Sequence, residues 1–231
     1  MQPHRTLIVA AHPDDEVLGC GGTIAMLREA GAPVRVLFLA EGVTARYDPS
    51  QFGDPKVIAQ IAQRNINAIK ALALLGVAKA DVVTAQRPCC RLDEVPLIEL
   101  SKEIERHIRD FKPQRLFCHA PDDVNVDHRL CHQATLAATR PLERGIQAVL
   151  AFEVLSSTEW NTLKPFRPTA FVDITATLDR KVAAMAAYEG EMRAAPHPRS
   201  GEVIRALATY RGAQAGVAAA EGFALMRGLD L

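Results

Sequence analysis

The segment His12-Pro13-Asp14-Asp15-Glu16 places one imidazole and three carboxylates directly after a short apolar run. Carboxylates crowded at the end of a buried strand repel one another and lose their hydration, so a bound cation is favoured there. A divalent metal ion satisfies that need, and it turns a bound water into a usable nucleophile near neutral pH. The segment therefore predicts a metal-dependent hydrolytic site.

Two histidines and one carboxylate form the candidate metal site. His12 and Asp15 come from one turn of the chain, and His128 completes a set of three from a polar stretch much later in the sequence. With water in the open position, this set is common in catalytic zinc sites. Non-haem iron(II) uses the same donors, so Zn²⁺ and Fe²⁺ both stay open. Asp14, adjacent to a ligand but facing differently, is the candidate general base for hydrolysis of an amide or ester.

Two further histidines lie near these positions. His132 follows His128 at the spacing of a His-x-x-x-His zinc helix, but the intervening glutamate of such helices is missing. We interpret His132 as a core residue or a support for the site. His119, at the end of a predicted strand, is open between a role in the site and a structural one.

Three further features of the sequence each allow a functional and a structural interpretation. Gly19-Cys20-Gly21-Gly22 fails the Gly-x-Gly-x-x-Gly spacing of dinucleotide sites, so we interpret these small residues as allowing a helix to pack on the sheet. The adjacent Cys89-Cys90 fit a chance substitution better than a redox or metal pair. Arg46 either binds substrate or pairs with Glu41.

Alternating strand-like and helix-like segments must position these side chains. Strands are predicted at residues 6–11, 34–40, 81–85, 115–119 and 148–154, and helices at 16–31, 55–75, 96–110, 128–139, 178–192 and 202–211. The alternation indicates an α/β fold, a mostly parallel sheet with helices on both faces, followed by a mostly helical C-terminal third. Ligands of such sheets bind beyond the carboxyl ends of the strands, so residues 12–16 and 119–128 are expected at one edge.

Composition narrows the class of protein. The 231 residues suit one domain over residues 1–231, and the equal counts of 27 basic and 27 acidic residues argue against a nucleic-acid binder. Five cysteines without a Cys-x-x-Cys pattern favour a reducing compartment, the cytoplasm. Residues 1–5 show no signal-peptide pattern, and no apolar stretch reaches the roughly 18 residues of a membrane span.

Two motifs carry a resemblance to a known family. Ala11-His12-Pro13-Asp14-Asp15-Glu16 after the first strand, together with Val126-Asp127-His128 after a later one, resembles the PIG-L (LmbE-like) deacetylases. The likeness extends over nearly the whole chain, through residues 41–46, 91–97, 123–129, 196–200 and 210–223. It implies a Rossmann-like α/β fold and zinc-dependent removal of an N-acetyl group from N-acetylglucosamine-type sugars.

The resemblance also implies roles for single residues. It makes His12, Asp15 and His128 the zinc ligands and Asp14 the general base, which agrees with the assignment from the residues themselves. Asp127, inside the second motif, is carried over as a further catalytic residue. The implied reaction is attack of zinc-activated water on the acetamide carbonyl, with zinc stabilising the oxyanion.

One position departs from the family pattern. Many relatives have a histidine three residues before the last ligand, where this chain has Asn125, whose amide cannot give up a proton at neutral pH. Either Asp14 returns the proton, or another histidine enters the site, for which we choose His197 between two prolines. A tyrosine of some members is also absent, with Asp123 near its place. Asn125 and Arg46 are the predicted substrate contacts.

The leading hypothesis is an N-deacetylase for an acetamido sugar that is nucleotide-linked or a glycoside. An esterase or deformylase with the same metal site is one alternative, and a sugar-binding module with a weak active site is another. Specificity is expected from the loops at residues 41–54, 86–94 and 156–168. The expected partner is therefore a small molecule, and a homo-oligomer is a further expectation because such assemblies are common among soluble proteins.

Overall fold

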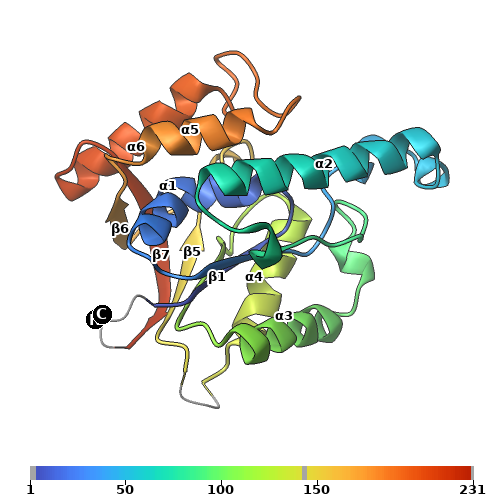
Figure 1. Cartoon of the computed structure of the whole chain (residues 1–231), viewed down its shortest axis with the longest axis horizontal. Coiled ribbons are helices and arrows are strands. Elements are labelled where there is room, and N and C mark those ends of the chain that lie inside the picture. Colours follow the sequence, from blue (N-terminus) through green and yellow to red (C-terminus); the bar gives the residue numbers. More distant parts are fainter. Residues whose placement is uncertain (1–3, 142–144, 230–231) are drawn as a thin grey trace.

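A mixed seven-stranded sheet lies at the centre of the described part of the chain (Figure 1). The computed structural model describes residues 4–141 and 145–229, so residues 1–3 of the N-terminal stretch lie outside it. The strands are β1 Thr6–Ala10, β2 Val34–Phe38, β3 Val82–Val83, β4 Arg115–His119, β5 Ala148–Phe152, β6 Ala170–Asp173 and β7 Ala220–Gly228. The helices are α1 Asp15–Glu29, α2 Pro55–Leu74, α3 Leu97–Phe111, α4 Val126–Ala138, α5 Leu178–Ala186 and α6 Gly201–Ala215.

The strand order is β3-β2-β1-β4-β5-β7-β6. Neighbours from β3 to β5 pair in parallel, whereas β7 runs antiparallel to both β5 and β6. The prediction of a mostly parallel sheet is therefore confirmed. Within the described residues, no helix is long and apolar enough to cross a membrane.

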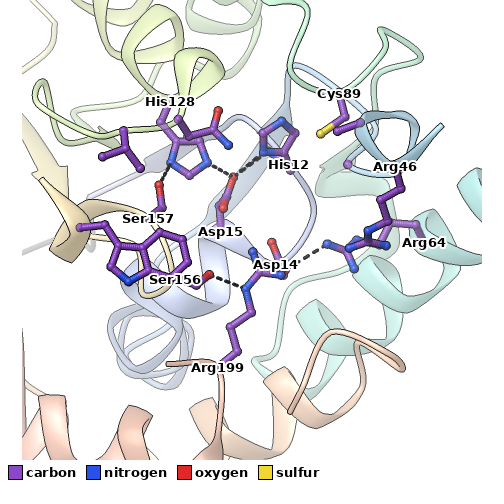
Figure 2. A pocket seen from close by; sticks show the side chains of 15 residues that line it. His12, Asp14, Asp15, Arg46, Arg64, Cys89, His128, Ser156, Ser157 and Arg199 are labelled. Atoms are coloured by element: carbon purple, nitrogen blue, oxygen red, sulfur yellow. Dashed lines mark hydrogen bonds and ion pairs between the residues drawn. The ribbon is translucent and has the colours of Figure 1, made fainter. Parts of the chain in front are cut away.

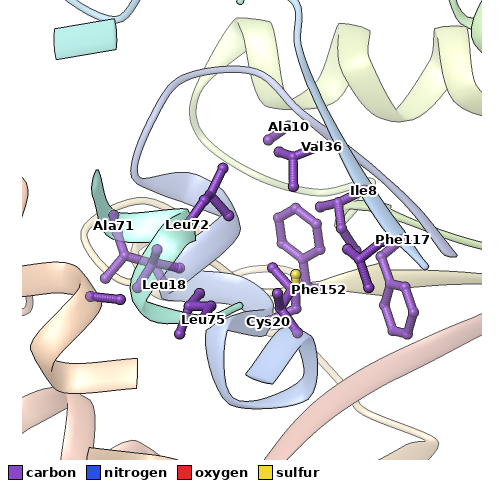
Figure 3. Close-up of a cluster of buried hydrophobic side chains, with 14 of the residues drawn as sticks. Ile8, Ala10, Leu18, Cys20, Val36, Ala71, Leu72, Leu75, Phe117 and Phe152 are labelled. Carbon is purple, nitrogen blue, oxygen red and sulfur yellow. The ribbon is translucent and has the colours of Figure 1, made fainter. Parts of the chain in front are cut away.

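Each face of the sheet is covered by its own set of helices, as predicted (Figure 1). Alternate residues of a strand point to opposite faces, so Ile8 and Ala10 of β1 pack with α1, α2, α5 and α6. Leu7 and Val9 of the same strand pack with α3 and α4 on the other face. Figure 3 shows the first of these cores, where Leu72 of α2 and Leu18 of α1 lie over the sheet near Phe152 of β5.

The prediction of a mostly helical C-terminal third is wrong for two segments. Residues 170–173 and 220–228 form β6 and β7, and α5 ends at Ala186 instead of continuing to residue 192. The β7 sequence Ala-Glu-Gly-Phe-Ala-Leu-Met-Arg-Gly has two glycines and little β-branched character, so its local signal for a strand is weak. Its pairing with β5 and β6 stabilises it instead. The third predicted strand is also shorter, because a 3₁₀ turn occupies Lys79–Asp81.

The glycines of α1 allow the helix to pack closely, which confirms the packing interpretation. A Cβ on Gly19 would lie 2.3 Å from Cδ2 of Phe152, and one on Gly22 would lie 2.7 Å from Cγ2 of Ile174. Both neighbouring side chains are buried and have little freedom to move. The helix also has a kink at Cys20, where φ is −147° and ψ is 24°. Small residues are therefore required where α1 passes over the sheet.

Replacing Gly19 with alanine is expected to destabilise the protein by about 1–3 kcal/mol, although alanine is the better helix former. The new methyl group overlaps the ring of Phe152. Chemical denaturation monitored by circular dichroism measures the change. Gly53→Ala is the control, because a Cβ there meets no atom within 4 Å, and its effect is expected within about 0.5 kcal/mol. Equal effects of the two substitutions would contradict the packing argument.

Candidate active site

A pocket of about 270 Å³ opens at the carboxyl ends of the parallel strands, where the sequence predicted it. The segments after β1, β2, β4 and β5 line it, and they bring together residues far apart in the sequence (Figure 2). Its lining includes all three loops predicted to determine specificity, through Arg46, Cys89 and Trp160. The pocket therefore brings together the three predicted metal ligands and Asp14.

The three predicted metal ligands face one another. Oδ2 of Asp15 lies 3.3 Å from Nδ1 of His12 and 3.3 Å from Nε2 of His128, and one donor atom from each of the three residues lies within 4.8 Å of the others. All three residues are buried. In Figure 2 the two imidazoles converge on the Asp15 carboxylate from different sides. This arrangement offers two nitrogen donors and one oxygen donor to a single ion.

A carboxylate holds the far side of each imidazole. Nε2 of His12 donates to Oδ2 of Asp127 at 2.8 Å, and Nδ1 of His128 lies 3.1 Å from Oδ2 of Asp123. Such partners fix ring orientation and raise ligand basicity in metal sites. Asn125 caps α4 by accepting a hydrogen bond from the Asp127 backbone at 2.9 Å, which places Asp127 and His128 on the first turn. The donor set and its supports thus fit a zinc ion.

The buried carboxylates of this cluster also favour a nearby positive charge. Burial lowers the pKa of His12, but hydrogen bonds with Asp127 and Asp15 raise it to about 10 overall. Burial likewise lowers the pKa of His128, which Asp15 and Asp123 raise to about 9. The pKa of Asp15 would rise on burial, yet the facing imidazoles hold it well below its usual range. Without a metal, protonated histidines supply the positive charge that the carboxylates require.

Metal-free protein is expected to lose stability as the pH rises through about 9 to 10. The pKa values of both histidines lie above their ordinary value of 6.5, so their stabilising contribution is complete below pH 6.5 and lost through about 9 to 10. Zinc requires neutral imidazoles, so its stabilising effect should grow over the same range. Melting temperatures of metal-free and zinc-loaded protein between pH 6.5 and 10 measure this. Parallel decreases for the two forms would contradict it.

Asp14 occupies an unusual backbone conformation beside the predicted metal ligands. Its φ is 114° and its ψ is −28°, a conformation that costs a non-glycine residue about 1–3 kcal/mol. Its backbone N–H donates to Oε2 of the buried Glu16 at 3.0 Å, and Glu16 also accepts from the Tyr188 hydroxyl. Oδ2 of Asp14 accepts from Arg64 and Arg199, each at 3.0 Å. Burial raises the pKa of Asp14, although Arg199 and Arg64 oppose that effect.

Glu191 joins the arginines of the pocket. It accepts hydrogen bonds from Arg46 at 2.7 and 2.9 Å and from Arg199 at 2.7 Å, and it pairs with Arg64 at 2.5 Å. The alternative pairing of Arg46 with Glu41 is wrong, because the Glu41 carboxylate accepts from backbone N–H groups of the following turn. Arg46 lines the pocket with about half of its side chain exposed.

The remaining histidines have other partners. Nε2 of His119 accepts from the Ala11 backbone at 2.8 Å, so this nitrogen is not free for a metal. Nδ1 of His132 donates to the carbonyl of His119 at 2.8 Å, which makes His132 a support for that strand end. His197 is half-buried, and its Nδ1 accepts from the Arg199 backbone at 3.1 Å. His197 is not among the described residues that line the pocket.

Sequence reasoning missed Arg64, Arg199, Glu191 and the role of Asp123 as partner of His128. Arg64 had a readable signal, because helical spacing puts it on the buried face of α2 with Val57 and Ala68. An arginine on an apolar face needs a buried anionic partner. Glu191 has no comparable signal, since it lies in an irregular stretch after α5.

A mostly parallel α/β sheet with a buried His-Asp-His donor set and a separate carboxylate at its strand ends defines an α/β protein with a candidate metal centre. The profile of the PIG-L family, GlcNAc-PI de-N-acetylase, matches residues 7–139, more than half of the chain. The chain belongs to the PIG-L family, as its motifs predicted.

Two relatives and one solved structure illustrate the range of that similarity. A 1D-myo-inositol 2-acetamido-2-deoxy-alpha-D-glucopyranoside deacetylase of Mycobacterium sp. (strain JLS) is 28% identical, with 85% of this chain and 77% of the relative covered. A 4-oxalmesaconate hydratase of Pseudomonas putida is 29% identical, with 80% and 73% covered. The N,N'-diacetylchitobiose deacetylase structure from Pyrococcus horikoshii shares the fold, with a TM-score of 0.77, 22% identity and 97% and 84% coverage.

Proposed function

We propose that this protein removes the N-acetyl group from an N-acetylglucosamine-type sugar conjugate, with a zinc ion held by His12, Asp15 and His128. The observation that carries the proposal is the convergence of these donors beside the Asp14 carboxylate in one pocket. The name of the mycobacterial relative supports an acetamido sugar as substrate. All five cysteines are free thiols, which supports a cytoplasmic location.

In this proposal the chain's own residues position water and move protons. Bound zinc supplies a Lewis acid that polarises the acetamide carbonyl. Among the described hydrogen bonds of the Asp14 carboxylate, all fall on Oδ2, so Oδ1 is left to take a proton from the attacking water. Asp127 and Asp123 keep the two imidazoles oriented throughout. Asp14 is therefore the general base.

The same carboxyl group is our candidate for protonating the leaving amine. Asn125 stands where many relatives have a histidine, and its side-chain oxygen is used in capping α4. His197, the other candidate acid, has its Nδ1 occupied by the Arg199 backbone. As the C–N bond breaks, Asp14 returns its proton to nitrogen, and acetate and the free amine leave.

The pocket walls suit a sugar. Arg46 and Asn125 line the pocket and are proposed to hydrogen-bond the substrate. Trp160 also lines it, with 56% of its surface exposed, and offers an apolar face of the kind on which sugar rings pack. Its loop is anchored to the partner of His128, because the Thr158 hydroxyl donates to Asp123 at 2.5 Å.

Acetate release tests the proposal. Zinc-loaded protein is incubated with free, glycosidic and nucleotide-linked N-acetylglucosamine compounds, and acetate and the new amine are both quantified. O-acetyl and N-formyl analogues run in parallel test the esterase and deformylase alternatives. Binding of these sugars without turnover would support the sugar-binding module instead. Hydration of 4-oxalmesaconate without acetate release from any sugar would instead indicate the activity for which the Pseudomonas putida relative is named.

A further inference from the structure

Two adjacent thiols lie beside the candidate metal site. Sγ of Cys89 and Sγ of Cys90 are 3.7 Å apart. Cys89 is buried and lines the pocket, whereas Cys90 is exposed. The proposed deacetylation uses neither thiol. The proposed chemistry therefore does not explain why Cys89 and Cys90 lie here. The interpretation of this pair as a chance substitution does not explain the potential metal ligands around it either.

Hydrogen bonds donated by the backbone N–H groups of Cys89 and Cys90 hold the turn that carries the two thiols. The Cys89 N–H donates to Oε1 of Glu41 at 2.9 Å and to Oγ1 of Thr44 at 2.8 Å. The Cys90 N–H donates to Oδ2 of Asp127 at 2.6 Å. Because these acceptors are themselves buried, the Cys89-Cys90 turn is fixed relative to the pocket.

The two sulfur atoms belong to a second group of potential ligands. Both Sγ atoms, a carboxylate oxygen of Asp127 and a ring nitrogen of His12 lie within 4.8 Å of one another. The zinc site described above uses the Nδ1 side of the His12 ring, and Asp127 lies on the Nε2 side. The second group is therefore adjacent to the first and opens on the other side of the same imidazole.

We propose that Cys89, Cys90 and Asp127 form a second cation site, which takes up a thiophilic divalent ion such as Cd²⁺ or excess Zn²⁺ and thereby inhibits the enzyme. Soft thiolate donors select such ions over Mg²⁺ or Ca²⁺. Each thiol releases its proton to solvent as the ion binds, since the thiolate is the ligand. This inference goes beyond the proposed deacetylation and requires no particular substrate.

Inhibition follows from the shared carboxylate. Oδ2 of Asp127 accepts hydrogen bonds from both His12 and Cys90, at 2.8 and 2.6 Å. An ion bound by the thiols and Asp127 competes with His12 for that oxygen. Loss of a carboxylate behind a ligand histidine reduces metal affinity or activity by about 10–100-fold in metal enzymes. When the second site is filled, we expect the activity of the enzyme to fall by about the same factor.

The test uses protein loaded with one equivalent of zinc and titrated with Cd²⁺. Thiolate-bound cadmium has an ultraviolet charge-transfer absorption that histidine and carboxylate ligands do not produce, so the band reports on the cysteines alone. We expect the band to saturate near one added equivalent. Cys90→Ser and the double variant Cys89→Ser/Cys90→Ser should lose it. Cys118→Ala is the control, because Cys118 is buried in β4 and this variant keeps both thiols.

Three results would overturn the proposal: no thiolate band in the wild-type protein, a band that persists in the double variant, or a band lost in Cys118→Ala. Circular dichroism establishes that each variant is folded. Because Cys90 is exposed, its single variant is expected to disturb folding less than the double variant does. In a second experiment, acetate release by each variant is measured with and without excess zinc. The activity with excess zinc is expressed as a fraction of the activity of the same variant without it. The absorption arm needs no substrate, so it remains decisive even where acetate release fails.

Discussion

Asp14→Asn is expected to reduce kcat by about 10²–10⁴-fold while the zinc content stays at one per chain, as befits loss of a general base. Asparagine keeps the size of the side chain but cannot take a proton from water. It also leaves His12, Asp15 and His128 in place, so metal binding is preserved. Acetate release and elemental analysis of the purified variant measure the two quantities.

The control for this substitution is Asp93→Asn, which removes an exposed carboxylate outside the pocket and should leave kcat unchanged. The pH profile adds a second measurement, because loss of the base should remove the acidic limb of the activity curve. Full activity in a metal-replete Asp14→Asn enzyme would refute the general-base assignment.

His128→Ala is expected to abolish stoichiometric zinc binding and to lower activity by about 10³-fold or more, because the Lewis acid is lost with its ligand. Alanine removes one of three donors and leaves the Asp15 and Asp123 carboxylates without the imidazole between them. Excess zinc should not restore activity in this variant. Wild-type protein stripped with a chelator should recover when zinc is returned.

His132→Asn is the matched control, four residues further along α4. His132 donates to the carbonyl of His119, and an asparagine amide can make a similar hydrogen bond. This variant should keep one zinc per chain with near-normal acetate release. If His132→Asn lost the metal and His128→Ala retained it, the ligand assignment along α4 would be reversed.

The sequence predicted those parts of the fold that depend on local patterns. β1 and β4 are apolar runs that end in polar residues, and a parallel sheet brings such strand ends to one edge. That rule is enough to bring His12 and Asp15 near His128. The α1 glycines were interpreted correctly for a similar reason, since their spacing excluded a dinucleotide site.

The remaining features depend on contacts between segments far apart in the chain. β7 forms because β5 and β6 supply partners on both sides, which its own composition does not indicate. Arg199 reaches Asp14 across 185 positions of sequence, and its role depends on how the irregular segment after α5 lies over the pocket. Of the two alternatives for Arg46, the pairing with Glu41 is wrong, because the Glu41 carboxylate is already used by its own turn, and Arg46 pairs with the distant Glu191 instead.

The partners of Asp14 and the proposed metal ligands come from different parts of the chain. The proposed metal ligands end at His128, whereas Arg199 and Glu191, which hold the base and its arginines, come more than sixty residues later. Arg64 of α2 holds the same carboxylate from the earlier part of the chain, so Asp14 has partners on both sides of His128 in the sequence. Substitutions of Arg199 or Glu191 are therefore expected to change the hydrogen bonds around Asp14 while every proposed metal ligand stays unaltered.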